Sequence, residues 1–75
     1  MPSSVVAKIQ YEAEHARMTV TFTSGRLYEY FLVPPHVAEE FQSALSKGSY
    51  FNSFIRDRYT CRDITPSGRN VSALG

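Results

Sequence analysis

The segment "RMTVTFTSGRLYEYFLVP", residues 17 to 34, decides the fold because it has the pattern of two strands joined by a short turn. Apolar and polar side chains alternate from Met18 to Phe22, as in a strand with one buried face. A Ser-Gly pair at positions 24 and 25 interrupts the pattern, and a run rich in aromatic residues follows. We predict an antiparallel hairpin in which Gly25 supplies the positive φ of the turn.

Two registers fit this hairpin, and they turn opposite faces of the second strand toward the core. A two-residue loop pairs Phe22 with Leu27 and puts Glu29 on the core face. A three-residue loop with a bulge at Gly25 instead sends Glu29 to water and places three side chains in the core: Tyr28, Tyr30 and Leu32. We favour the second register because an unpaired buried carboxylate is costly. In the first, Tyr28 and Tyr30 would form an aromatic platform on the open face of the sheet.

The residues on either side of the hairpin complete the fold. Residues 5–13, VVAKIQYEA, alternate with period two and predict a first strand with one buried face, one set being Val5, Ala7, Ile9, Tyr11 and Ala13. After Pro34 and Pro35 the apolar spacing becomes helical, which predicts a helix that ends near Gly48. Its expected apolar positions are Val37, Phe41, Ala44 and Leu45, with Ala38 on the flank of the stripe.

A second helix is predicted over "YFNSFIRDRY", residues 50 to 59, with Ser49 as its N-cap. At 100° per residue its apolar arc contains Tyr50, Phe51, Phe54, Ile55 and Tyr59, and Phe51, Phe54 and Ile55 are expected in the core. Residues 60–75 have no periodicity and are expected to form a flexible tail. The predicted fold is α+β: a three-stranded antiparallel sheet followed by two helices on one face, β-β-β-α-α, in one domain over residues 1–59.

Composition and charge limit the class of protein. A chain of 75 residues supports one small domain. Cys61 is the single cysteine, so no intrachain disulfide forms, which suits a reducing compartment. The N-terminal sequence lacks the pattern of a signal peptide, and no apolar run approaches the roughly 20 residues of a membrane span. We therefore expect a cytoplasmic protein with no membrane partner.

The basic charge is concentrated toward the C-terminus, although the net charge is only +1. Residues 1–46 hold three basic and five acidic side chains, whereas residues 47–75 hold five basic and two acidic ones. This asymmetry favours an anionic partner for the second half of the chain.

Few residues in the sequence suggest catalysis. His15, His36 and Cys61 do not have the spacing of a metal site. Glu39 and Glu40 are adjacent, so on a helix they point in different directions and cannot face each other as an acid–base pair. Phosphate-binding, dinucleotide-binding and serine-nucleophile motifs are absent from the sequence. We predict no enzyme activity, no cofactor and no metal.

Two segments together resemble a known family. The run "SGRLYEYFLVP" (24–34) followed by "ALSKGSYFNSFIRDRY" (44–59) is similar to the KTSC domain. This short domain is found at the C-terminus of some lysyl-tRNA synthetases and as stand-alone bacterial and phage proteins. The features that match are Tyr28, Tyr30, Val33-Pro34, Ser46-Lys47-Gly48, Tyr50-Phe51-Asn52, Ile55 and Tyr59. The resemblance implies a small nucleic-acid-binding module, with RNA as the partner.

The predicted RNA site uses one edge of the second helix. RNA-binding proteins stack unpaired bases on rings and arginine planes and hold base edges with amides. We predict that Asn52, Arg56 and Tyr59 share this edge, with Lys47 and Arg58 on phosphates; the full set is Lys47, Tyr50, Asn52, Arg56, Arg58 and Tyr59. Tyr50 and Tyr59 would serve equally well as core rings, and Asn52 as an amide that binds backbone.

An alternative function is protein interaction. A thin sheet with an exposed edge strand, such as residues 5–13, can pair with a strand of another chain. The domain would then be a protein–protein adaptor or a homodimer that acts through its strand edge or a helix face. Salt dependence separates the two classes, because phosphate binding weakens steeply as salt rises and an apolar interface does not.

Overall fold

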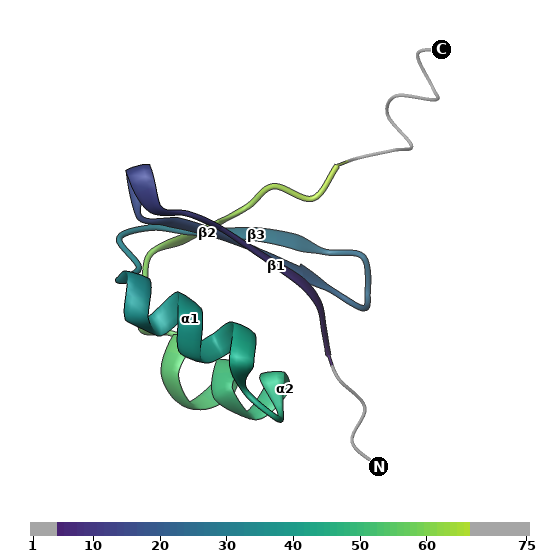
Figure 1. Ribbon diagram of the computed structural model, residues 1–75. Coiled ribbons are helices and arrows are strands. Elements are labelled where there is room, and N and C mark those ends of the chain that lie inside the picture. Colours follow the sequence, from purple (N-terminus) through teal and green to yellow (C-terminus); the bar gives the residue numbers. More distant parts are fainter. Residues whose placement is uncertain (1–4, 67–75) are drawn as a thin grey trace.

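A four-stranded antiparallel sheet with helices on one face forms the fold (Figure 1). The structure is a computed structural model and describes residues 5–66. The strands lie in chain order across the sheet: β1 (Val6–Glu12), β2 (Arg17–Phe22), β3 (Leu27–Tyr30) and β4 (Cys61–Asp63). A short 3₁₀ helix, η1 (Ala13–His15), connects β1 to β2. The α+β class and the packing of the helices on one face are confirmed.

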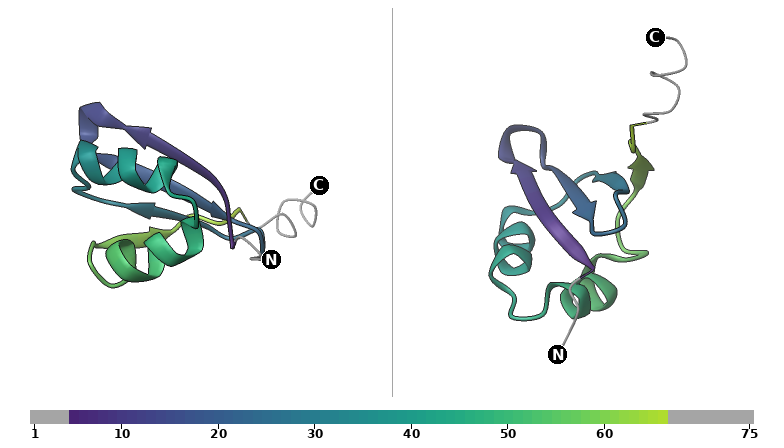
Figure 2. Two further views of the ribbon diagram at one scale, coloured as in Figure 1. Left: turned by 60° about the horizontal axis from the view of Figure 1, so that its bottom comes forward. Right: turned by 90° about the vertical axis from the view of Figure 1, so that its right-hand side faces the viewer.

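Three helical segments pack against the same side of the sheet (Figures 1 and 2). They are α1 (Pro35–Ser43), α2 (Lys47–Tyr50) and the π-helix η2 (Phe51–Ile55), which continues α2 without a break. The described part of the chain contains no helix that is both long and apolar enough to cross a bilayer.

The favoured hairpin register is confirmed. Met18 lies opposite Tyr30 and Val20 opposite Tyr28, so both tyrosines share the core face of the sheet. Phe22 N donates to the Arg26 carbonyl at 2.9 Å, which closes a three-residue loop over 23–25. Gly25 has a φ of 97°, a conformation that a side chain disfavours. The alternative in which these tyrosines form a platform on the open face is therefore wrong.

Leu32 and Glu29 depart from the expected pattern. Leu32 was expected in the core but is 79% exposed, because the alternation ends with β3 and its own φ of 57° turns the chain. Val33 is fully buried instead, and its N–H donates to the Ala16 carbonyl at 2.9 Å. Glu29 lies on the open face as predicted, yet two arginines cover it, and only 12% of its side chain is exposed.

The first strand is interrupted by a bulge. The register between β1 and β2 shifts between Val6 and Lys8, and this shift exchanges the two faces of the strand. Val6 is therefore buried, whereas Val5 and Ala7 are exposed. The expectation that Val5 and Ala7 share a buried face with Ile9 and Tyr11 is wrong for this reason.

The boundary between the two helices lies earlier than predicted. Helix α1 ends at Ser43, and the extended backbone at Ala44 leaves Leu45 fully exposed instead of on the apolar stripe. The N-cap of the second helix is Ser46, whose side chain accepts from Ser49 N at 3.3 Å. Gly48 therefore lies inside the first turn of α2, not at the C-terminus of α1 as expected.

The second helix also ends earlier and is wider than predicted. Arg56 N donates to the Phe51 carbonyl at 2.8 Å, a π-type bond that spans five residues. The helix ends at Ile55, and Asp57 then takes a left-handed φ of 61°. Phe51 and Ile55 still reach the core, but Phe54 is 53% exposed because a π turn rotates it away from the position that a 100° period gives. The expectation of a core Phe54 is wrong.

Part of the predicted tail belongs to the sheet. Residues 61–63 form β4 against β3, with Tyr30 opposite Cys61 and Glu29 opposite Arg62. Ile64 N donates to the Leu27 carbonyl, and Leu27 N donates to Thr65 Oγ1, both at 2.9 Å. The prediction of three strands is therefore wrong, because the sheet has four. The prediction of a flexible tail from residue 60 is also wrong for residues 61–63, which pair with β3. The rest of the predicted tail, residues 67–75, lies outside the described residues.

Candidate nucleic-acid interface

Asn52 and Arg56 form the part of the predicted site that the structure brings together. Asn52 lies in η2 and Arg56 follows it directly, and both side chains are exposed. Arg56 Nη1 donates to Asn52 Oδ1 at 3.4 Å. The remaining guanidinium N–H groups and the Asn52 amide donors face outward as a set that can bind phosphate or a base edge.

Arg58 and Tyr59 reach the surface from a loop rather than from the helix. The loop turns at Asp57, and Arg58 N donates to the Ile55 carbonyl at 3.0 Å. Arg58 is exposed, whereas Tyr59 is half-buried against the core. The prediction that Asn52, Arg56 and Tyr59 share one helical edge is therefore wrong, because the helix does not extend to Tyr59.

Tyr50 is turned toward α1. Its hydroxyl donates to Glu40 Oε1 at 2.8 Å, and its ring stacks on Phe41 with centroids 5.6 Å apart. Desolvation by burial, followed by the hydrogen bond to Glu40, raises the pKa of the Tyr50 phenol to about 12. These contacts hold the Tyr50 ring in place as a structural group.

Phe54 is the exposed ring that sequence reasoning missed. Its centroid lies 4.7 Å from that of Tyr50, and it stands between Asn52 and Arg56 in the sequence. An exposed aromatic ring is the kind of group on which an unpaired base stacks. The 100° helical period of the sequence placed Phe54 in the core. Its exposed position follows from the π turn, which the sequence does not indicate.

Lys47 lies at the far end of the same helical segment. Its Nζ donates to the Ala44 carbonyl at 3.2 Å, and it lines a hollow of about 230 Å³ together with Ala7, Lys8, Ile9 and Gln42. Lys47 is the first residue of α2, whereas Arg56 directly follows the end of η2. Lys47 is therefore a separate basic residue near β1 and does not belong to the group over residues 52–58.

Ion pairing divides the basic side chains into two groups. On and beside the open face of the sheet, Arg17 and Arg62 pair with Glu29, Arg17 also pairs with Glu12, and Arg26 pairs with Asp63. Within residues 5–66, four other cations form no ion pair: Lys8, Lys47, Arg56 and Arg58. Three of these unpaired cations, Lys47, Arg56 and Arg58, are residues predicted to bind RNA.

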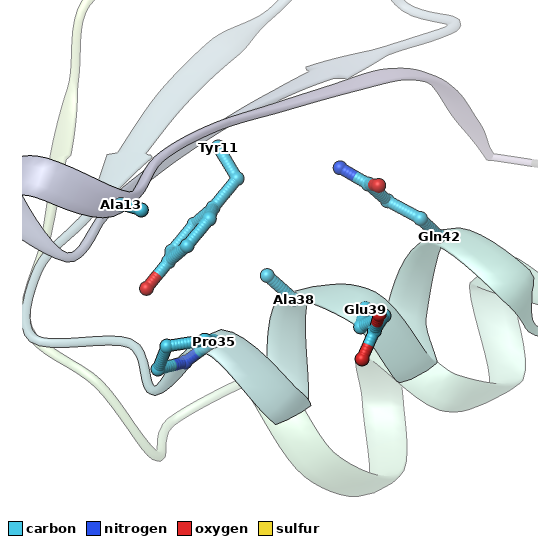
Figure 3. A pocket seen from close by; sticks show the side chains of 6 residues that line it. All are labelled: Tyr11, Ala13, Pro35, Ala38, Glu39 and Gln42. Carbon is cyan, nitrogen blue, oxygen red and sulfur yellow. The ribbon is translucent and has the colours of Figure 1, made fainter.

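Two further features of the described residues could hold a ligand. A hollow of about 280 Å³ lies between β1 and α1, with Tyr11 and Ala38 in its walls (Figure 3). Beside it, the Tyr11 hydroxyl donates to the Val33 carbonyl at 2.6 Å. Glu12, Glu14 and His15 place ligand atoms within 4.8 Å of one another, but all three are exposed and Glu12 is already bonded to His15 and Arg17. These two bonds lower the pKa of Glu12.

Comparisons with known proteins place the chain in a family. The KTSC domain model matches residues 2–59. The chain is 45% identical over 62 residues to a lysine–tRNA ligase of Nostoc punctiforme, covering 83% of this chain but only 11% of that protein. It is also 34% identical over 59 residues to an uncharacterized protein of Stutzerimonas stutzeri, covering 79% of this chain and 83% of that one.

A solved structure agrees with the fold. The crystal structure of a KTSC domain protein from Yersinia pestis superposes with a TM-score of 0.79 at 31% identity, over 85% of this chain and 90% of that one. The chain spans about a tenth of the length of the lysine–tRNA ligases that it matches. From the residues matched and the shared fold, this chain belongs to the KTSC domain family.

Proposed function

We propose that this KTSC domain is a non-enzymatic RNA-binding module that acts in the cytoplasm. The observation that carries the proposal is the exposed group over residues 52–58. Arg56 and Arg58 have no carboxylate within ion-pair distance among the described residues, although Arg17, Arg26 and Arg62 do. A cation left unpaired while the other arginines within residues 5–66 are neutralised is available to a phosphate.

Each side chain in the group has a distinct role. Arg56 and Arg58 bind phosphates, and the Asn52 amide donates to or accepts from a base edge. Phe54 offers a face for stacking an unpaired base. Lys47 supplies a second phosphate contact at the other end of the α2–η2 segment. Tyr50 and Tyr59 support the surface from within and do not touch RNA directly.

The relatives indicate which RNA to test first. Lysine–tRNA ligases from three bacterial strains, two of Nostoc and one of Trichormus variabilis, match this chain at 43–45% identity. Their name connects the matched proteins with tRNA, so tRNA is the first probe. Unpaired bases stack more readily than paired ones, so a short single-stranded RNA is the second.

Two charge-matched double variants test the proposed surface. Arg56→Gln with Arg58→Gln removes two positive charges from the group, and Arg26→Gln with Arg62→Gln removes two from the paired arginines. We expect the first variant to bind total tRNA about tenfold more weakly by fluorescence anisotropy at about 50 mM salt, and the second to change binding by about twofold or less. Equal losses in both variants would show that only net charge matters and would overturn the site.

A further inference from the structure

Strand β1 is an edge of the sheet whose outer backbone groups can be identified from the register. Phe22 N donates to the Arg26 carbonyl, so the backbone groups of Phe22 point toward β3. Because the backbone groups of successive residues in β2 point to opposite neighbouring strands, the backbone groups of Thr19 point toward β1, where Thr19 pairs with Gln10. The N–H and C=O groups of Ile9 and Tyr11 therefore point to the free edge, where none of residues 5–66 pairs with them.

We propose that a second copy of this chain pairs with that edge, with the two β1 strands antiparallel and centred on Gln10. In this register Ile9 of one copy and Tyr11 of the other form a hydrogen-bonded pair, and each uses the backbone groups that face the free edge. The result is one continuous eight-stranded sheet with a two-fold axis through the Gln10 pair. This inference is independent of RNA binding.

The side chains of β1 are complementary to themselves in this register alone. Lys8 of each copy lies opposite Glu12 of the other, at positions where side chains of an antiparallel pair come closest. Lys8 forms no ion pair with any described residue of its own chain. Glu12 pairs with His15 and Arg17, but 48% of its side chain is exposed, and a carboxylate can accept a further hydrogen bond at each oxygen. If the strands were centred on Ile9, Lys8 would lie opposite Gln10. If they were centred on Tyr11, Glu12 would lie opposite Gln10. In neither register do two residues of opposite charge within β1 face each other.

The hollows beside β1 have room for the inner side chains of the second copy. One hollow, of about 280 Å³, has Tyr11, Ala38 and Gln42 in its walls, and Figure 3 shows the Tyr11 ring at its edge. The other, of about 230 Å³, lies along Ile9 toward Lys47. In the paired register Ile9 of the second copy meets the first hollow and its Tyr11 meets the second. The bulge between Val6 and Lys8 lies outside the five paired residues.

Charge exchange tests the register. We expect the full chain to dimerise with a dissociation constant on the order of 10⁻⁵ M, since the paired surface is small, as measured by sedimentation velocity. Lys8→Glu and Glu12→Lys should each weaken the homodimer roughly tenfold, because two attractive pairs become repulsive. A mixture of the two variants should restore dimerisation, since both pairs then carry opposite charges. Arg58→Glu carries the same charge change as Lys8→Glu and should leave the dimer intact.

Amide hydrogen exchange locates the contact even if Glu12→Lys fails to fold. In the unmodified chain the N–H groups of Ile9 and Tyr11 should exchange more slowly as protein concentration rises, while the N–H of Gln10 stays protected throughout by β2. A chain that stays monomeric at about 1 mM would overturn the proposal. So would a dimer in which Ile9 and Tyr11 exchange at a concentration-independent rate, because its interface must then lie elsewhere.

Discussion

Glu29 Oε1 accepts a hydrogen bond from Arg62 Nη2 at 3.0 Å, across 33 residues of sequence. Arg17 Nε lies 3.4 Å from the other carboxylate oxygen, so Glu29 is held between β2 and β4. This arrangement joins the residues after Tyr59 to the sheet. It also explains how a carboxylate remains mostly covered on the open face without an unpaired charge.

Truncation tests the structural role of β4. A chain that ends at residue 59 loses, among other contacts of β4, the bonds from Phe31 N to the Thr60 carbonyl, from Ile64 N to the Leu27 carbonyl and from Leu27 N to Thr65 Oγ1. At about 1 kcal/mol each, we expect the free energy of unfolding to fall by about 3 kcal/mol. The matching loss in melting temperature is about 12 °C or more. A chain that ends at residue 66 is the reference, and equal thermal stability of the chains that end at residues 59 and 66 would contradict the role of β4.

The hairpin turn should depend on glycine at position 25. Gly25→Ala should lower the free energy of unfolding by about 1 kcal/mol, because φ is 97° there and a side chain disfavours it. A Cβ at this position meets no atom within 4 Å, so the cost is conformational and not steric. Urea unfolding measures it, with Ser24→Ala as the control in the same loop. A neutral Gly25→Ala variant would argue against this turn.

The π turn makes opposite predictions for two neighbouring phenylalanines. The Phe51 ring contacts Phe22 and Tyr30 edge-on, at centroid distances of 5.2 and 5.9 Å. Phe51→Ala should therefore cost about 3–5 kcal/mol of unfolding free energy. Phe54→Ala should cost about 1 kcal/mol or less, since the ring is 53% exposed and contacts mainly Tyr50. A regular α-helix would bury Phe54 and make the two losses similar, so urea unfolding of both variants distinguishes the two helices.

Stability should fall at alkaline pH through Tyr50. Burial and Glu40 favour the neutral phenol in the folded protein, so its pKa rises from 10.0 to about 12. This contribution is complete below pH 10 and is lost as the pH rises toward 12, because the unfolded chain loses the proton more easily. Tyr50→Phe should be less stable than the unmodified protein below pH 10, by about 1 kcal/mol, and this deficit should shrink toward pH 12. Parallel stability curves for the two proteins would contradict the assignment.

The sequence predicts the elements of this fold that repeat a regular pattern. The hairpin register follows from the cost of burying Glu29, and the burial of Phe41 in α1 follows from the helical spacing of the apolar residues after Pro35. In each case a periodic apolar pattern and one energetic argument agree. The membership of the KTSC family was likewise visible from the motifs around Tyr30 and Asn52.

Local breaks in periodicity account for what the sequence did not predict. The bulge after Val6 and the left-handed Leu32 each shift the alternation, and neither position is itself a Gly or Pro. The π turn at Phe54 alters the period within a single turn. Strand β4 is three residues long and its side chains are exposed, so its pairing depends on partners such as Glu29 that are distant in sequence. These breaks also separate Tyr59 from Asn52 and Arg56 in the candidate site.

Amide NMR of the full chain titrated with total tRNA, at about 50 and 200 mM salt, tests RNA binding most directly. We predict shifts concentrated on residues 52–58 and at Lys47, clearly weaker at the higher salt. Shifts confined to β1, or no shifts at either salt concentration, would contradict an RNA-binding surface at Asn52, Arg56 and Arg58.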